Sequence, residues 1–277
     1  MPTIRTEGRG AIEIYYEEQG RGEPVVLIGG GSSTAEVWGY QVPALAARNR
    51  VITPDNRGSG RTRVEDDDGV RTPVRFAGDV LALLDALALE CAHLVGASMG
   101  GMIAQEFALR HPDRTASLVI ACSSFCVPPA VAAGEEVSRA WFSGSAEGAS
   151  PEQVRAAVEV LVHPETREKR KERLDFYLST KVRHPHSAEE LVRRAIGLAS
   201  FDVRDRLAEL RVPTLVLAGS HDVLMPPENA RLLARRIQAA EIQTIDEAGH
   251  MFFIEQPDAS NRLLLDFLGR HPLKPEP

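Results

Sequence analysis

The first half of the chain alternates short apolar runs of strand length with longer segments whose apolar residues recur at helical spacing. The apolar runs predict strands at residues 12–16, 25–28, 51–54, 91–95 and 116–122. The segments with an apolar stripe predict helices at residues 37–48, 76–89 and 102–110. Because strands and helices alternate, we expect right-handed crossovers and a mainly parallel sheet.

This alternation stops near residue 125 and starts again near residue 200. In between, the pattern predicts only helices, at residues 151–162, 165–182 and 188–199, with Ser150 and Ser187 as caps of two of them. Strands are predicted again at 212–218 and 242–245, and helices at 228–236 and within 252–268. We therefore expect a core domain made of residues 1–124 and 201–277. A helical insertion, residues 125–200, is expected to cover the C-terminal edge of the strands as a lid.

Composition narrows the class of protein. The 277 residues are 43% hydrophobic and 26% charged, which is typical of a globular protein. A net charge of −7, without a basic stripe, argues against a nucleic-acid partner. No apolar run approaches membrane-spanning length and no basic-plus-apolar leader opens the chain, so we expect a cytoplasmic protein without a membrane partner. The three cysteines lack metal-ligand spacing, which predicts core packing and no metal site.

The segment from Gly96 to Gly101 reads Gly-Ala-Ser-Met-Gly-Gly between a predicted strand and a predicted helix. Gly-x-Ser-x-Gly in this context is the signature of a nucleophile elbow. The glycines are needed because bulky neighbours would clash where the strand turns directly into the helix. The strained turn is expected to hold the hydroxyl of Ser98 above the sheet edge, where helix N–H groups favour negative charge.

Two further groups follow late predicted strands and are expected at the same edge as Ser98, where ligands bind in open α/β sheets. A serine hydroxyl needs a base, and His250 is the histidine that follows a late strand in a glycine-flanked turn. Asp222 would orient its ring and stabilise the imidazolium. Asp246 is disfavoured, because it stands at the same strand end as the histidine. The order Ser, Asp, His along the chain predicts a catalytic triad of Ser98, Asp222 and His250.

Three other short stretches carry candidate chemistry. Gly29, Gly30 and Gly31 follow a predicted strand and would allow a ligand to approach the backbone closely, although a flexible turn would use the same residues. The turn at residues 55–62 is expected to be shaped by pairing between arginine and aspartate. The run at residues 66–68 holds three aspartates without other ligands around it, which predicts a solvated loop.

Together these motifs make the chain resemble the α/β-hydrolase superfamily across nearly its whole length. The pattern looks like that of lidded esterases, enol-lactonases and polyketide methyl esterases. The resemblance implies an α/β fold with a mostly parallel, eight-stranded sheet flanked by helices, an inserted helical lid and no cofactor. It also implies that Met99 donates one oxyanion N–H. The loop that supplies the other usually opens with His-Gly. Here Gly29 replaces the histidine and Gly30 keeps the glycine, so Gly31 falls at the donor position.

The sequence therefore predicts a serine hydrolase that cleaves a small carboxylic ester or lactone through an acyl-enzyme. Gly30, Phe125, Trp141 and Phe142 are candidates to contact a substrate with an apolar part, and core packing would explain the three aromatic residues equally well. Cleavage of a carbon–carbon bond in a diketone-like substrate would use the same triad. A cofactor-free lyase or oxygenase, or a non-catalytic ligand binder, is the alternative from another functional class.

Overall fold

A computed structural model of the protein describes residues 2–6, 10–65, 67–238 and 240–273. Within these residues one sheet runs in the order β1-β2-β4-β3-β6-β7-β8-β9, and β5 pairs with β2 beside that path. The strands are β1 (Thr3–Arg5), β2 (Ile12–Gln19), β3 (Glu23–Ile28), β4 (Asn49–Pro54), β5 (Arg63–Val64), β6 (Ala92–Ala97), β7 (Thr115–Ala121), β8 (Thr214–Gly219) and β9 (Ala240–Ile245). All neighbours from β4 to β9 are parallel, whereas β2 runs antiparallel to β1, β4 and β5. The predicted α/β fold and mainly parallel sheet are thus confirmed.

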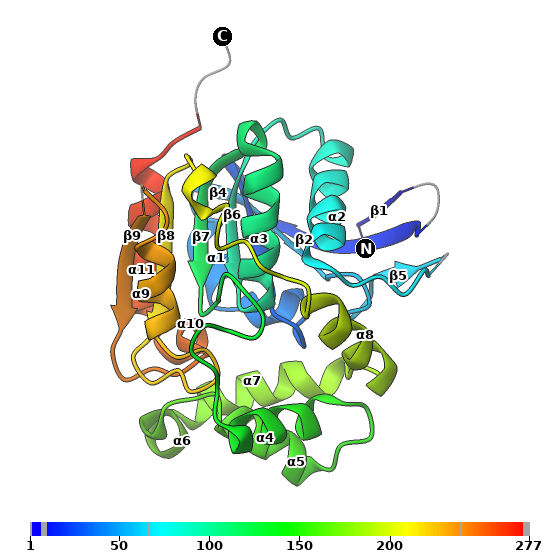
Figure 1. The fold of residues 1–277 in the computed structure, drawn as a ribbon, viewed down its shortest axis with the longest axis vertical. Coiled ribbons are helices and arrows are strands. Elements are labelled where there is room, and N and C mark those ends of the chain that lie inside the picture. Colours follow the sequence, from blue (N-terminus) through cyan, green and yellow to red (C-terminus); the bar gives the residue numbers. More distant parts are fainter. Residues whose placement is uncertain (1, 7–9, 66, 239, 274–277) are drawn as a thin grey trace.

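Helices lie on both faces of the sheet and at one end of it (Figure 1). The elements outside the inserted segment are η1 (Ala35–Trp38), α1 (Gln41–Leu45), α2 (Pro73–Ala86), α3 (Met99–Arg110), η2 (Pro112–Arg114), η3 (Leu207–Glu209), α9 (Glu228–Ala234), α10 (Phe252–Glu255) and α11 (Pro257–Arg270). The helix predicted at residues 37–48 is broken: η1 and α1 are short and separate.

Strand residues alternate between two cores, which explains why the central strands are apolar throughout. In β3, Val26 and Ile28 pack in one core with α2, α3 and α9. Val25 and Leu27 pack in the other, with α1, α10 and α11. Because both faces are covered, the carboxyl ends of the parallel strands remain as the edge where a site can form.

The segment between β7 and β8 contains α4 (Glu135–Ser145), α5 (Pro151–Glu159), α6 (Pro164–Lys169), α7 (Lys171–Arg183) and α8 (Ala188–Leu198). It lies below the carboxyl ends of the strands in Figure 1. The predicted caps are present, since Ser150 accepts from the N–H of Gln153 and Ser187 from that of Glu190. The sequence prediction missed α4 and ran α6 and α7 together.

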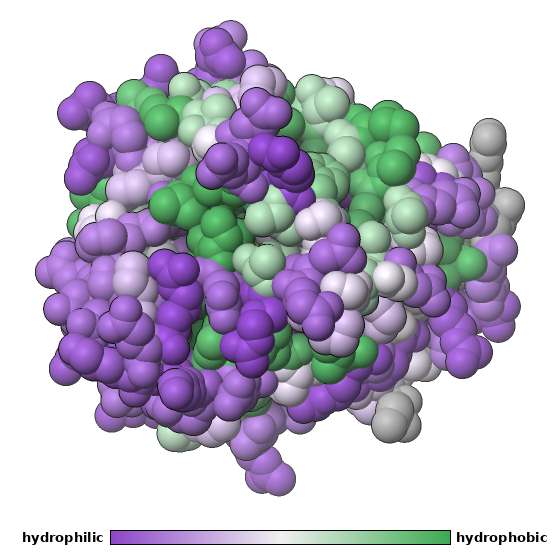
Figure 2. Space-filling view, turned by 90° about the horizontal axis from the view of Figure 1, so that it is seen from below, coloured by the Kyte–Doolittle hydropathy of each residue, from purple (hydrophilic) through white to green (hydrophobic). Residues whose placement is uncertain are grey.

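Seen from below, this segment presents apolar side chains among hydrophilic ones (Figure 2). Phe142, Val182, Val192 and Ile196 of the segment are 47%, 61%, 57% and 70% exposed. The helices of the segment are therefore less completely packed than α3, whose residues 99–108 are all buried. Fewer buried contacts make a segment easier to open locally.

Two loop predictions meet different outcomes. In the turn at 55–62, Nε of Arg61 donates to Oδ2 of Asp55 at 3.0 Å, which is the expected pairing of arginine with aspartate. The prediction of a solvated loop at 66–68 holds for Asp67, which is exposed and pairs with Arg71 and Arg193. It is wrong for Asp68, whose side chain is only 9% exposed and pairs with Arg75. Asp66 lies outside the described residues. Sequence spacing could not reveal the pairing with Arg193, because Arg193 is 126 residues away from Asp67.

Candidate active site

Ser98 sits in the turn that joins β6 directly to α3. Its backbone has φ 57° and ψ −120°, a strained conformation for a residue with a side chain. Glycine is required on both sides of it. A Cβ on Gly96 would lie 2.1 Å from the carbonyl oxygen of Gly100, and a Cβ on Gly100 would lie 2.1 Å from that of Ile28. The turn therefore needs the Gly-x-Ser-x-Gly spacing and leaves Ser98 at the first turn of α3.

His250 and Asp222 form a buried pair at the same end of the sheet. Nδ1 of His250 donates to Oδ2 of Asp222 at 2.8 Å, and the two residues are 4% and 3% exposed. Oδ1 of Asp222 accepts from the backbone N–H of Leu224 at 3.0 Å and of Met225 at 2.7 Å. These bonds fix the carboxylate and leave Nε2 of His250 as the nitrogen able to accept a proton.

The loop that carries His250 is tied to the inserted segment. The backbone N–H of His250 donates to the carbonyl oxygen of Leu161 at 2.8 Å. The buried carboxylate of Glu255 accepts from the N–H of Gly249 on one oxygen, and from the N–H of His163 and the hydroxyl of Thr166 on the other, each at 2.7 Å. Desolvation raises the pKa of Glu255 against the effect of these donors. The position of His250 thus depends on residues 161–166 as well as on the sheet.

The loop after β3 lies against the serine. A Cβ on Gly30 would be 3.3 Å from Cβ of Ser98, and one on Gly31 would be 3.9 Å from the sulfur of Met99. The carbonyl oxygen of Gly30 accepts from the N–H of Ser33 at 3.3 Å. Because a trans peptide points its C=O and N–H in opposite directions, the N–H of Gly31 faces away from that bond. Within the described residues, neither this N–H nor that of Met99 has a hydrogen-bond partner.

Two side chains anchor this loop, in which Gly29 stands where the family resemblance led us to expect a histidine. The side chain of Asn56 donates to the carbonyl oxygen of Gly29 at 2.9 Å. Nη1 of Arg194, from α8, donates to that of Gly31. The loop is therefore held from the core on one side and from the inserted segment on the other.

A cavity of about 30 Å³ brings these groups together. Ser98, His250, Gly30, Gly31 and Trp141 all line it. Side chains that sequence reasoning did not assign to the site also line it: Cys122, Leu161, Tyr177, Leu224, Met251 and Phe253. They come from five separate stretches of the chain, so no local pattern could have identified them.

Two of the candidate substrate contacts are not in the lining. Phe125 is buried in the core, where the guanidinium of Arg236 lies 4.8 Å from its ring centroid. Phe142 is 47% exposed and packs edge-to-face on the outer side of Trp141. Neighbouring positions on α4 face different ways, which is why Trp141 reaches the cavity and Phe142 does not.

Among the described residues, no group of three or more His, Cys, Asp or Glu side chains is arranged to hold a metal ion. Within the same part of the chain, no helix is both long and apolar enough to cross a membrane.

Comparison with known proteins agrees with this fold. The family model described as alpha/beta hydrolase fold matches residues 23–257. A putative carbamate hydrolase, RutD, from Azorhizobium caulinodans is 35% identical, with 94% of this chain and 96% of that protein covered. A 2-hydroxy-6-oxo-6-phenylhexa-2,4-dienoate hydrolase from Comamonas testosteroni is 32% identical, with 92% and 91% covered. The structure of a thermophilic esterase from Thermogutta terrifontis, with malate bound, superposes with a TM-score of 0.84 at 28% identity, covering 98% of this chain and 100% of the esterase.

The chain belongs to the α/β hydrolase family. The family and the named relatives together support hydrolase activity.

Proposed function

We propose that the protein is a serine hydrolase that cleaves a small carboxylic ester or lactone through an acyl-enzyme. The observation that carries the proposal is that His250, bonded to the buried Asp222 at 2.8 Å, lines one cavity with a serine held at positive φ. Structural serines and histidines do not need a strained backbone, a buried acid partner and a shared cavity at once.

The proposed reaction uses these groups in sequence. Oγ of Ser98 attacks the carbonyl carbon while Nε2 of His250 takes its proton, and Asp222 stabilises the imidazolium. The N–H groups of Gly31 and Met99 bind the oxyanion, a contribution of about 3–4 kcal/mol for a donor of this kind. The imidazolium then protonates the departing alkoxide. Water, activated by His250, releases the acid and restores the serine.

We further propose that residues 125–200 act as a lid on the core of residues 1–124 and 201–277. Ligand cavities usually measure about 300–1,000 Å³, so the 30 Å³ space must enlarge before a substrate can bind. Trp141, Leu161 and Tyr177 enter the cavity from this segment and are apolar or aromatic. They would contact the apolar part of the substrate.

Two other reactions on a carbonyl carbon have support from the relatives. The Comamonas relative is named for a dienoate substrate, which favours carbon–carbon bond cleavage as the second candidate. The Azorhizobium relative is named as a putative carbamate hydrolase, which makes a carbamate the third. Turnover measured on matched esters, lactones, carbamates and vinylogous diketo acids distinguishes the three candidate reactions: ester or lactone hydrolysis, carbon–carbon bond cleavage and carbamate hydrolysis.

The direct test of the activated serine is intact mass after incubation with a fluorophosphonate. We expect one adduct on the wild-type protein and none on Ser98→Ala. An adduct that persists in Ser98→Ala, or a folded wild-type protein that forms no adduct, would contradict the proposal.

A further inference from the structure

A buried ammonium group lies beside the active-site loop without a carboxylate partner. Lys181 of α7 is 9% exposed, and Nζ donates to the carbonyl oxygen of Ser32 at 3.2 Å and to its hydroxyl. Among the described residues no carboxylate pairs with it. An ammonium group has three N–H donors, so one remains for another acceptor.

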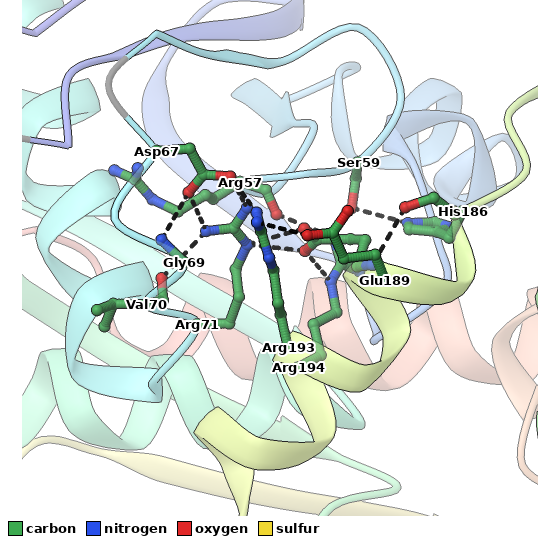
Figure 3. Close-up of polar contacts among 12 residues, drawn as sticks. Arg57, Ser59, Asp67, Gly69, Val70, Arg71, His186, Glu189, Arg193 and Arg194 are labelled. Carbon is green, nitrogen blue, oxygen red and sulfur yellow. Dashed lines mark hydrogen bonds and ion pairs between the residues drawn. The ribbon is translucent and has the colours of Figure 1, made fainter.

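Arg194, whose charge acts on Lys181, belongs to a network of ion pairs between α8 and the loop before α2 (Figure 3). Glu190 accepts from Arg71 and from Arg194, each at 2.8 Å. The remaining pairs are Arg71 with Asp67, Arg193 with Asp67, and Arg193 with Glu189. Three arginines therefore face three carboxylates.

This network leaves no negative charge for Lys181. Burial, followed by the charge of Arg194, lowers the pKa of Lys181 to about 7. Burial and the same cations push the pKa of the nearby His186 far below its usual range, so its ring is neutral. A buried cation without a counter-charge is unfavourable, and an anion placed beside it would relieve that cost.

There is space for such an anion. Lys181 lines a cavity of about 210 Å³ together with Ser32, Val154, Val182 and His186. Ser32 also lines the catalytic cavity, so the two spaces share a wall. Nζ of Lys181 lies 5.7 Å from the ring centroid of Tyr177, one helical turn earlier, and that ring lines the catalytic cavity.

We propose that Lys181 and this second cavity form a subsite for a carboxylate carried by the substrate, whose scissile carbonyl group lies at Ser98. The inference rests on the proposed function and narrows its substrate to acyl groups that end in a carboxylate. A carboxylate fits because it carries one charge and can accept from both Nζ of Lys181 and the hydroxyl of Ser32. Val154 and Val182 provide apolar wall for the methylene groups. A phosphate dianion would keep an unmatched negative charge.

The test compares charged and neutral esters of equal size. The probes are the 4-nitrophenyl half esters of succinate, glutarate and adipate, each beside the ester in which a methyl group replaces the carboxylate. We expect Lys181→Met to lower kcat/KM for the best half ester at least tenfold more than for its neutral match. Lys181→Arg, which keeps the charge, should retain most of the preference. Lys171→Met, an exposed change on the same helix, should leave it unchanged.

Equal losses on both esters would assign Lys181 a purely structural role, and no loss would remove it from the site; either result overturns the inference. Calorimetric binding of monomethyl glutarate to Ser98→Ala, with and without Lys181→Met, tests the subsite without turnover. Binding that depends on Lys181 while every ester stays intact would retain the subsite and reject the proposed function. Absence of binding, or equally tight binding of inorganic phosphate, would overturn the carboxylate assignment.

Discussion

The two walls of the catalytic cavity are built in different ways. The sheet edge supplies Ser98 and His250 from turns that directly follow β6 and β9. The inserted segment supplies Trp141, Tyr177 and the neighbouring Lys181 from the faces of two helices. In the first wall a side chain is placed by the backbone of its own turn. In the second it is placed by how helices pack, so it can change while the chemistry stays.

The largest effect is expected from the sheet wall. Ser98→Ala removes the nucleophile and should lower kcat by about 10⁶-fold, as loss of a triad serine does elsewhere. Binding of monomethyl glutarate should persist, because neither Lys181 nor the segment changes. Product formation at high enzyme concentration, measured at fixed times, gives the residual kcat of Ser98→Ala. If kcat falls by less than about 100-fold, a group other than Ser98 attacks the carbonyl carbon.

Asp222→Asn should have the next largest effect. The amide keeps the shape of the side chain but favours the wrong tautomer of His250, and a loss of about 10⁴-fold in kcat is expected. KM should change little, since Asp222 does not line the cavity. Steady-state kinetics on one ester measure both, and a main effect on KM would contradict the assigned role.

Glu255→Gln tests the hydrogen bonds that connect the His250 loop to the inserted segment. An amide cannot accept on both sides, so at least one buried N–H or hydroxyl group loses its partner, at about 1–3 kcal/mol. We expect a comparable loss in the free energy of unfolding and about a tenfold loss in kcat, because the His250 loop shifts. Urea unfolding and kinetics measure the two effects. Glu247→Gln, an exposed change in the same loop, is the control.

Lys181→Met should have the smallest effect on neutral esters and a distinctive effect on stability. Below pH 7 the lysine is charged in both folded and unfolded chains, and its burial destabilises the fold. The pKa of Lys181 is about 7 in the folded protein and 10.5 in the unfolded chain, so between these pH values only the unfolded chain keeps the proton. The free energy of unfolding of the wild type therefore rises with pH relative to that of Lys181→Met. From pH 6 to pH 9 we expect the free energy of unfolding of the wild type to increase, relative to that of Lys181→Met, by on the order of 2 kcal/mol. Urea unfolding at each pH measures this difference. If the difference between wild type and Lys181→Met stays constant from pH 6 to pH 9, Lys181 does not titrate in the folded protein.

The comparison also explains what the sequence could predict. The position of Ser98, Asp222 and His250 at one edge of the sheet was predictable because each follows a strand, and the order of strands places such ends together. Phe125 and Phe142 were candidates on residue type and on their place in the helical segment, and neither lines the cavity. Arg193, one of the two partners of Asp67, and Ser32, the partner of Lys181, each lie more than 120 residues away from the residue they contact. Contacts of that range depend on how the inserted helices dock, which no local pattern encodes.

The carboxylate of Glu255 has a consequence for engineering by segment exchange. Residues 161–166 are bonded to it and to the His250 loop, whereas α4 and α8 make no bond to that carboxylate. A chimera that imports a whole helical segment from a relative would also exchange the residues that support the His250 loop. If the splice points lie inside the segment and residues 161–166 are kept from the host, the exchange would transfer the cavity-lining Trp141 position of α4 and leave the support of the His250 loop unchanged. The useful unit of recombination in this enzyme is therefore smaller than the insertion itself.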